Sequence, residues 1–192
     1  MMKFSRTNIS DVVVCEPIVH GDERGYFFES FREDKLADFL GHPVKFVQDN
    51  ESLSAKGVLR GLHYQLPPCA QSKLVRVIEG EVLDIAVDIR VGSDTFGQHV
   101  SVVLSGENKK QLFIPRGFAH GFVVLSESAK FAYKVDNYYS PECDRGIAFG
   151  SSTLAIDWQL DRDELLISGK DMNQPDFLDS QELFSIEDEQ YG

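Results

Sequence analysis

Cysteine is scarce in this chain of 192 residues, which contains three cysteines far apart in the sequence. Cys15, Cys69 and Cys143 form no CxxC pair, and their odd number does not suit a framework of paired disulfides. The sequence therefore argues against a disulfide-stabilised fold and against a structural zinc site, and it predicts a reducing, cytoplasmic compartment.

Positive charge is also in deficit, because 19 lysines and arginines stand against 31 aspartates and glutamates. The net charge of −12 argues against the broad basic surface that sequence-independent binding of nucleic acid requires, but it permits a small anionic ligand. No apolar run approaches a membrane span, and residues 1–14 lack the pattern of a signal peptide. The length suits one domain over residues 1–192, with an acidic, solvated tail expected from about residue 180.

Histidine is the third scarce residue type, with five copies in the chain. A metal-binding β-barrel usually presents two histidines two positions apart, then a carboxylate, then a histidine on a later strand. His63 is followed by tyrosine and glutamine, and the stretch that should supply a carboxylate holds Lys73, although His120 fits the later histidine. Because unopposed cations such as Arg60 and Lys73 disfavour a divalent ion, we predict no metal.

Short β-branched and alternating segments dominate, separated by clusters of turn residues. They predict strands in residues 11–19, 72–79, 81–90, 97–105, 110–115, 120–126 and 130–140. We interpret Glu79-Gly80-Glu81 as a hairpin turn. Helical patterns are confined to residues 32–41 and 161–168. The expected fold is mainly β, an antiparallel sandwich or barrel with a few short peripheral helices.

Residues 81–90 alternate between an apolar face and a face that carries Asp84 and Asp88. For Asp88 we favour a solvated outer face. For Asp84 a solvated face and a polar barrel interior stay open.

The same scarce residues suit an anionic ligand and proton transfer. Arg60 and Lys73 suit phosphates, and His63 can act as a general base near neutral pH if a carboxylate orients it. From spacing alone, structural roles are favoured for His120 and Tyr133, as a surface ion pair is for Arg24. Strict alternation separates Arg60 from His63, so both can line one pocket only if Gly61 forms a bulge or bend.

Six segments between about residues 20 and 171 form an ordered set: "DERGYFFESF", "FVQDNESLSAKGVLRGLHYQ", "KLVRVIEGEVLDIAVDIR", "FIPRGFAHGF", "YKVDNYYSPECDRGIAF" and "SGKD". The set resembles the dTDP-4-dehydrorhamnose 3,5-epimerase family, which consists of cupin-type (jelly-roll) β-barrel enzymes. The resemblance implies epimerisation of C3 and C5 of dTDP-4-dehydro-6-deoxy-D-glucose through an enolate. It implies neither a metal nor another cofactor, because the substrate's own ketone takes the charge.

Site residues follow from the resemblance. His63 matches the general base, Tyr133 the proton donor, and Lys73 a cation beside the sugar oxygen. Asp171 matches the carboxylate that orients His63, with Asp84 as the alternative for that role.

Further residues match binding positions of the family. These are Arg60, His120 and Lys170 toward the sugar, and Arg24, Glu29, Gln48, Asp49 and Asn50 toward the nucleotide. Asp144 stands where the family pattern has a glutamate, so its shorter side chain puts that substrate contact in question. Phe27 is either a thymine-stacking residue or a core residue. N-terminal contacts of this family often come from the neighbouring subunit, which implies a homodimer.

Other functions also fit parts of this sequence. A related enzyme that inverts C3 alone or C5 alone keeps the same residues. A non-catalytic sugar-nucleotide-binding cupin would lack His63, Tyr133 or the orienting carboxylate, and a metal-dependent cupin would bind iron, zinc or manganese.

Overall fold

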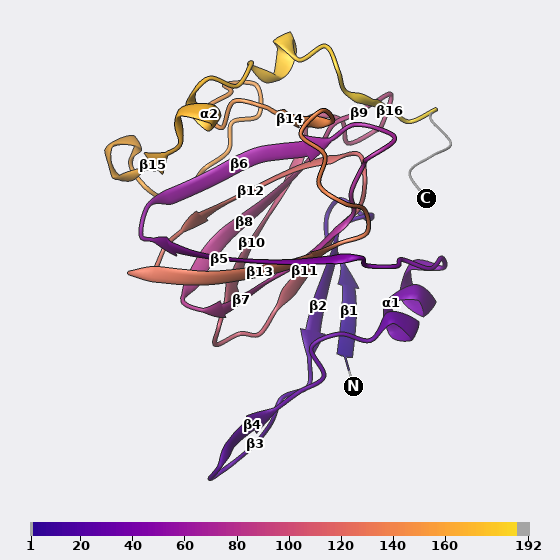
Figure 1. The fold of residues 1–192 in the computed structure, drawn as a ribbon, viewed down its shortest axis with the longest axis vertical. Coiled ribbons are helices and arrows are strands. Elements are labelled where there is room, and N and C mark those ends of the chain that lie inside the picture. The colour runs from indigo at the N-terminus through magenta and orange to yellow at the C-terminus, as the bar shows by residue number, and fades with distance from the viewer. Residues whose placement is uncertain (1, 188–192) are drawn as a thin grey trace.

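The computed structural model describes residues 2–187, and two facing sheets form most of it (Figure 1). The first sheet has the strand order β1-β2-β11-β7-β13-β5. Its strands are β1 (Met2–Arg6), β2 (Val13–Pro17), β5 (Gln48–Ala55), β7 (Lys73–Glu79), β11 (Gln111–Ile114) and β13 (Ser128–Val135).

The second sheet has the order β10-β8-β12-β6-β14, and β15 adds to β6 in parallel. Its strands are β6 (Val58–Gln65), β8 (Glu81–Asp88), β10 (His99–Ser105), β12 (Phe118–Val124), β14 (Asp144–Gly146) and β15 (Leu166–Ile167). Consecutive strands from β5 to β8 alternate between the sheets. The mainly β, antiparallel prediction is confirmed. The pairings among residues 2–187 keep the two six-stranded sheets separate in a jelly-roll arrangement, with no continuous closed ladder.

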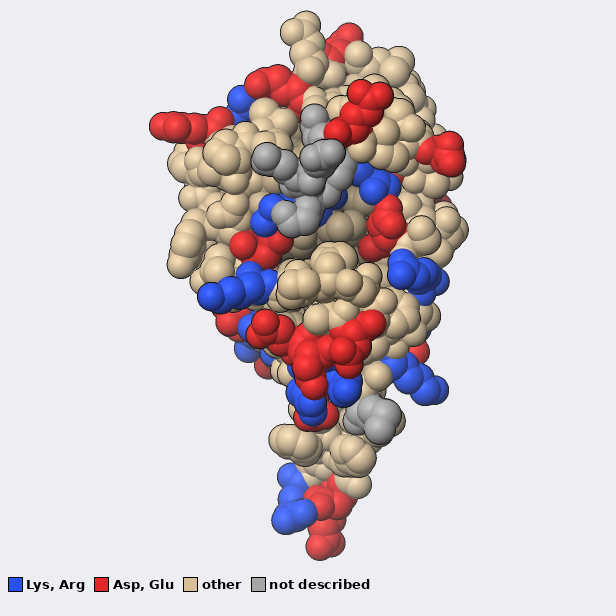
Figure 2. All heavy atoms as spheres, turned by 90° about the vertical axis from the view of Figure 1, so that its right-hand side faces the viewer, with Lys and Arg blue, Asp and Glu red and all other residues tan. Residues whose placement is uncertain are grey.

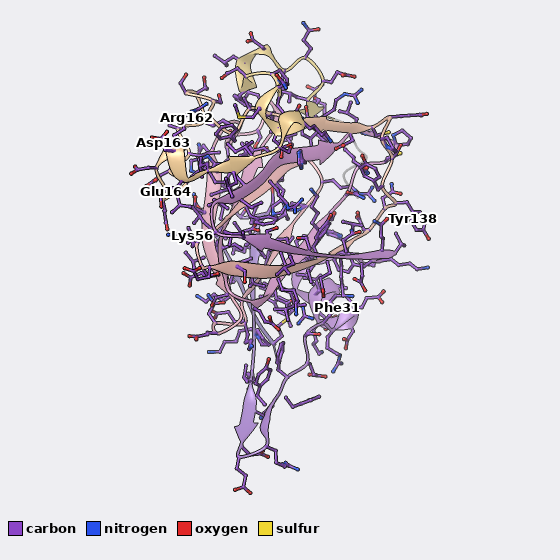
Figure 3. The ribbon with its side chains drawn as sticks, turned by 60° about the vertical axis from the view of Figure 1, so that its left-hand side comes forward. Phe31, Lys56, Tyr138, Arg162, Asp163 and Glu164 are labelled. Atoms are coloured by element: carbon purple, nitrogen blue, oxygen red, sulfur yellow. The ribbon has the colours of Figure 1, made fainter. Side chains whose placement is uncertain are left out.

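Short elements surround the sandwich. They are the helices α1 (Glu33–Leu40) and α2 (Gly169–Met172), the 3₁₀ turns η1 (Arg162–Glu164) and η2 (Phe177–Asp179), and the strand pairs β3 (His20–Asp22) with β4 (Gly25–Phe27) and β9 (Arg90–Val91) with β16 (Phe184–Ser185). The helix predicted in residues 32–41 is confirmed as α1. In residues 161–168 the structure has η1 and β15, and Lys56 pairs there with Glu164 at 3.8 Å (Figure 3). No helix among the described residues has the length and apolarity to cross a membrane.

The predicted hairpin at Glu79-Gly80-Glu81 is wrong. β7 pairs with β11 and β13, whereas β8 pairs with β10 and β12. Gly80 has a φ of +81°, and a Cβ at this position would lie 2.0 Å from the carbonyl oxygen of Ser128. The turn is thus a tight corner that carries the chain from one sheet to the other, and glycine permits it.

Both faces of β8 are buried. Val82 and Ala86 pack with Val75 and Phe131 of the facing sheet, while the opposite face, including Ile85, packs under the C-terminal segment.

The expected solvated face of Asp88 is therefore wrong. Asp88 is fully buried and accepts hydrogen bonds from Arg90, Ser93 and Thr95. Asp84 is also fully buried, in the interior that was one of its two expected positions.

The acidic segment after residue 180 packs on the body as far as the structure describes it. Phe184 is 3% exposed, and Glu182 forms an ion pair with Arg145 at 2.7 Å. Residues 188–192 of the expected tail lie outside the described residues. On the face shown in Figure 2, acidic and basic side chains are interspersed, including at the tip of the projecting β3–β4 hairpin.

Candidate active site

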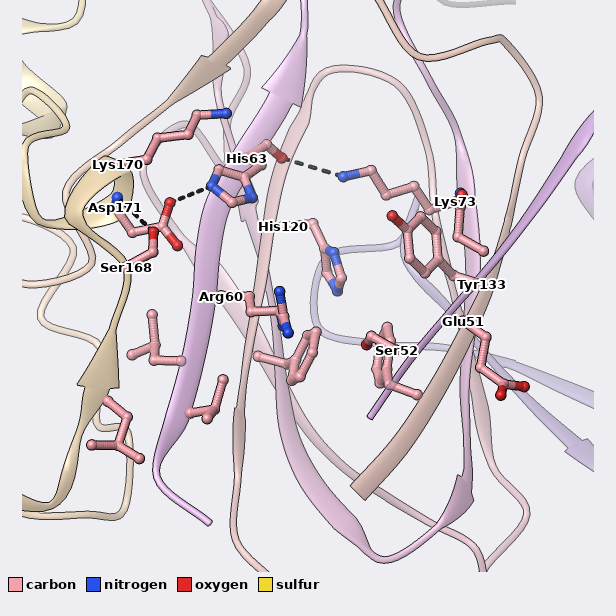
Figure 4. Close-up of a pocket in the computed structure, with 16 residues that line it drawn as sticks. Glu51, Ser52, Arg60, His63, Lys73, His120, Tyr133, Ser168, Lys170 and Asp171 are labelled. Atoms are coloured by element: carbon pink, nitrogen blue, oxygen red, sulfur yellow. Dashed lines mark hydrogen bonds and ion pairs between the residues drawn. The ribbon is translucent and has the colours of Figure 1, made fainter. Parts of the chain in front are cut away.

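A cavity of about 590 Å³ lies between the sheets (Figure 4). This volume is within the range of small-molecule sites. Its polar and charged lining comprises Asn50, Glu51, Ser52, Arg60, His63, Lys73, His120, Tyr133, Ser168, Lys170 and Asp171. Most of the residues expected to contact a ligand thus meet in one pocket.

His63 and Asp171 form a hydrogen-bonded pair at one wall of the pocket. His63 Nε2 lies 2.6 Å from Asp171 Oδ1, although the residues are far apart in the sequence. If Nε2 carries the proton that this carboxylate accepts, Nδ1 presents a free lone pair. Of the two carboxylates considered for His63, the structure brings Asp171 to it.

Asp171 is held from two further directions. Ser168 caps α2 by accepting a hydrogen bond from the backbone N–H of Asp171 at 3.1 Å, and Gly61 N–H approaches Asp171 Oδ2 at 3.5 Å. Burial raises the pKa of Asp171, but the hydrogen bonds from His63, Gly61 and Ser168 outweigh it, so the net pKa is lowered. The group is therefore a carboxylate at neutral pH.

The bend expected at Gly61 is confirmed. Against β12, His63 pairs with His120 and Arg60 pairs with Phe122, so β6 carries one extra residue in a bulge. Gly61 has a φ of +130°, and a Cβ there would lie 2.5 Å from the Cα of the neighbouring strand's glycine. Glycine therefore lets Arg60 and His63 line the same pocket.

Lys73 enters from the opposite sheet, at the start of β7. Its Nζ donates to the carbonyl oxygen of His63 at 3.4 Å. Burial lowers the pKa of Lys73 to about 8, against the attraction of Asp144 and Asp84, which raises it. The side chain is thus a desolvated ammonium near neutral pH.

His120 and Asp84 form a second buried pair. His120 Nε2 lies 3.0 Å from Asp84 Oδ2, with Phe131 stacked against the imidazole. Burial raises the pKa of Asp84 and lowers the pKa of His120, so burial opposes charge separation in this pair. The structure assigns Asp84 to His120 and leaves His63 to Asp171.

Tyr133 reaches the pocket from β13. Burial raises the pKa of its phenol, against the attraction of Arg60. The phenol therefore remains protonated at neutral pH and can donate a proton. Figure 4 places Tyr133 across the pocket from His63.

Arg60 projects into the same cavity. Its guanidinium donates to Ser54 at 3.2 Å, and no carboxylate among the described residues forms an ion pair with it. On β5, Gln48 donates to Asn50 at 2.9 Å, while Asp49 is exposed and forms an ion pair with Lys134. Asn50 lines the pocket, whereas Asp49 lines a neighbouring hollow.

Asp144 lies beside the pocket and not in its lining. Its carboxylate pairs with Lys170 and accepts a hydrogen bond from Tyr139 at 3.1 Å. The hydrogen bond between Lys170 and Asp144 raises the pKa of Lys170. The shorter aspartate therefore reaches Lys170, the residue next to Asp171.

Arg24, Glu29 and Phe27 lie outside this pocket. Arg24 is on the projecting hairpin and pairs with Asp22 at 2.5 Å, and Glu29 pairs with Arg32 at 3.3 Å. Phe27 is 69% exposed, which excludes the core role. A single chain does not bring these residues to the site.

Sequence reasoning missed Ser168. The spacing Ser-x-x-Asp in "SGKD" is a helix-capping pattern that would have indicated it. Phe122 and Phe131, also missed, form a stacked pair with ring centroids 4.1 Å apart in the pocket wall.

Together these groups suit acid–base chemistry on an anionic, carbonyl-containing ligand. A carboxylate-oriented imidazole and a protonated phenol lie across a pocket that also holds the cationic side chains of Arg60, Lys73 and Lys170. No cluster of three or more metal-ligating side chains occurs within residues 2–187.

Known proteins resemble most of the chain. Residues 6–179 match the family model for dTDP-4-dehydrorhamnose 3,5-epimerase. The enzyme of that name from Pseudomonas aeruginosa is 55% identical over 93% of this chain and 98% of its own length. The crystal structure of the Elizabethkingia anophelis enzyme superposes with a TM-score of 0.90 at 50% identity, covering 93% of this chain and 98% of that one.

A third relative comes from Legionella pneumophila and was solved in complex with dTDP-4-keto-L-rhamnose. It has a TM-score of 0.91 and 50% identity, covering 96% of this chain and 98% of that one. The chain belongs to the dTDP-4-dehydrorhamnose 3,5-epimerase family.

Proposed function

We propose that this chain epimerises C3 and C5 of dTDP-4-dehydro-6-deoxy-D-glucose to give dTDP-4-dehydro-L-rhamnose. The observation that supports this proposal most strongly is that the His63–Asp171 pair and Tyr133 lie on opposite walls of one pocket. Inversion of a carbon centre needs a base on one face and an acid on the other. Family membership and the ligand-bound relative support this choice of substrate.

Proton removal falls to His63. The ketone at C4 acidifies the protons on C3 and C5, and Nδ1 of His63 takes one of them. Asp171 accepts a hydrogen bond from the Nε2–H group, which fixes the tautomer and stabilises the imidazolium that forms.

Lys73 stabilises the enolate. A desolvated ammonium beside the developing oxyanion lowers the barrier more than an exposed lysine does, because the surrounding dielectric is low. With a pKa of about 8, Lys73 is protonated in roughly nine-tenths of the molecules at pH 7. The substrate's carbonyl takes the electron pair, so the reaction requires no redox change.

Tyr133 returns a proton to the opposite face of the enolate. Its phenol has a raised pKa, so it is fully protonated before the transfer. The transient phenolate lies near Arg60, whose charge stabilises it. A second round at the other carbon completes the reaction.

Binding of the nucleotide involves the remaining cations and a second copy of the chain. Arg60 and Lys170 attract the anionic sugar nucleotide, with His120 toward the sugar and Gln48, Asp49 and Asn50 toward the nucleotide. Asp144 acts through its pairing with Lys170.

A homodimer explains the residues that lie away from the pocket. The β3–β4 hairpin projects from the body with Phe27 exposed (Figure 1), so Arg24 and Glu29 of one subunit serve the pocket of the other. We place this dimer in the cytoplasm, because three scattered cysteines without a CxxC pair favour a reducing compartment.

Incubation with dTDP-4-keto-6-deoxyglucose in D₂O tests the function. Deuterium is expected at C3 and C5, and NMR of the product distinguishes double inversion from inversion at one carbon. His63→Ala should slow exchange at both carbons by roughly 10²–10⁴-fold. Absence of exchange in the wild-type enzyme would refute the proposed reaction.

Mixing two inactive variants tests the shared site. If each pocket uses Arg24 of the other subunit, mixed dimers of Arg24→Ala and His63→Ala chains contain one intact site. After subunit exchange, an equimolar mixture should recover about a quarter of the wild-type activity. If Arg24 serves its own chain, no activity returns.

A further inference from the structure

Two segments that end next to the pocket run side by side. Leu66, directly after β6, donates its N–H to the carbonyl of Cys143 at 2.9 Å. Its carbonyl accepts the N–H of Cys69 at 3.0 Å. Both cysteines are thus hydrogen-bonded through their backbones to the same residue.

Side chains fasten these segments together. Gln65 is 4% exposed, donates to the carbonyl of Cys69 at 2.6 Å and accepts the N–H of Ser140 at 2.7 Å. Asn137 donates to the carbonyl of Pro68 at 3.0 Å. Tyr138 marks this end of the sandwich in Figure 3. The two cysteine positions are therefore held in place by a network of five hydrogen bonds.

The two side chains are also close to each other. Cys143 lies near enough to raise the pKa of the Cys69 thiol, and Ser140, which is also near, lowers it. The net pKa of Cys69 is raised, so Cys69 is a thiol at neutral pH. Both side chains are partly exposed, whereas Cys15 is buried and burial raises its pKa to about 12. Only Cys69 and Cys143 combine closeness to each other with access to solvent.

We propose that Cys69 and Cys143 are a reversible redox pair that closes to an intramolecular disulfide when a two-electron oxidant such as hydrogen peroxide is present. The bond closes a loop that contains β7 to β13, and a long loop favours stabilisation of the folded state. It also ties the segment leading into Lys73 to the segment leading into Asp144.

The reaction balances with peroxide as the electron acceptor. One cysteine loses its proton, and its thiolate attacks a peroxide oxygen. The O–O bond breaks to give a sulfenic acid and hydroxide, which takes up the released proton to become one water. The second thiol attacks the sulfenic sulfur, and a second water leaves as the S–S bond forms. Two thiols lose two electrons and two protons, and one peroxide becomes two waters.

Thiol counting on the purified full-length chain tests the proposal. The reduced protein should bind three iodoacetamide groups in denaturant. After hydrogen peroxide it should bind one, and proteolysis should yield a peptide linking Cys69 to Cys143. Thermal unfolding should move up by roughly 5–15 °C, and dithiothreitol should reverse both changes.

Single variants give the matched controls. Cys69→Ser and Cys143→Ser should form no internal link and show no rise in unfolding temperature, while Cys15→Ser should behave as wild type. Basal activity should be unchanged in all three. Three alkylated thiols after peroxide, or links only between chains on a non-reducing gel, would overturn the proposal. The assay uses no sugar nucleotide, so its result is independent of the proposed function.

Discussion

Replacement of Asp171 by asparagine isolates the orientation of His63. The backbone N–H of residue 171 keeps its bond to Ser168, so α2 keeps its cap. Gly61 N–H points at Oδ2 and favours an oxygen there, which turns the new amide nitrogen toward His63 Nε2. That nitrogen donates a hydrogen bond, so Nε2 must accept it and the ring proton moves to Nδ1. The lone pair needed for proton removal is then blocked.

The magnitude follows from two losses. A hydrogen bond to a charged group contributes about 1.5–3 kcal/mol, which corresponds to a factor of roughly 10–150. The wrong tautomer adds to this, and an equivalent Asp→Asn change in serine proteases lowers kcat by ~10⁴. We therefore expect kcat to fall by roughly 10²–10⁴-fold in Asp171→Asn, with KM changed little.

Deuterium exchange at C3 and C5 in D₂O measures this loss at the proton-removal step. Asp84→Asn is the matched control, because Asp84 is an equally buried carboxylate bonded to the other histidine of the pocket. We expect its exchange rate to fall less than that of Asp171→Asn. Thermal unfolding checks that both variants fold. Exchange within about threefold of wild type in Asp171→Asn, or a larger loss in Asp84→Asn, would contradict the orientation of His63 by Asp171.

Three more predictions concern Tyr133, Lys73 and Gly80. Tyr133→Phe should slow product formation by roughly 10²–10³-fold while substrate protons still wash out into D₂O, and equal losses in both would exclude the acid role. Because the pKa of Lys73 is about 8, kcat should decline as pH rises through 8 and the ammonium is lost. Lys73→Arg should move that decline upward, and an unmoved limb would assign it elsewhere. Gly80→Ala should lower stability by at least ~2 kcal/mol, or roughly 4–8 °C, because of its φ and its contact with Ser128. Gly169→Ala, which has open space, is the control, and equal melting temperatures would contradict this account.

The fold predictions that the structure confirms rest on local sequence patterns. The apolar spacing and terminal glycine of residues 32–41 predict α1, which ends at Leu40 before Gly41 in the left-handed conformation. Alternation predicted the strands, because a period of two is a property of each strand by itself. The bend at Gly61 followed from a conflict between strand alternation and the requirement that Arg60 and His63 line one pocket.

Which strands pair with each other, and which faces are buried as a result, are not local properties of the sequence. The incorrect predictions concern these properties. Gly80 is compatible with a hairpin and with a corner between sheets, and only the pairing of β7 and β8 with other strands decides. Asp88 was predicted to face solvent because a strand face that carries carboxylates is usually exposed. Its burial is compensated by Arg90, Ser93 and Thr95, which a tight local turn folds back onto it.

The position of Asp171 depends on a strand pairing that has too few residues to produce a recognisable sequence pattern. β15 has two residues, Leu166 and Ile167, and pairs in parallel with Val58 and Leu59 of β6. Ser168 follows immediately and starts the turn that brings Asp171 beside His63. A slip of one residue in this pairing would shift the turn by about 3.3 Å, more than the 2.6 Å contact can absorb. Two backbone pairings thus fix the contact between Asp171 and His63.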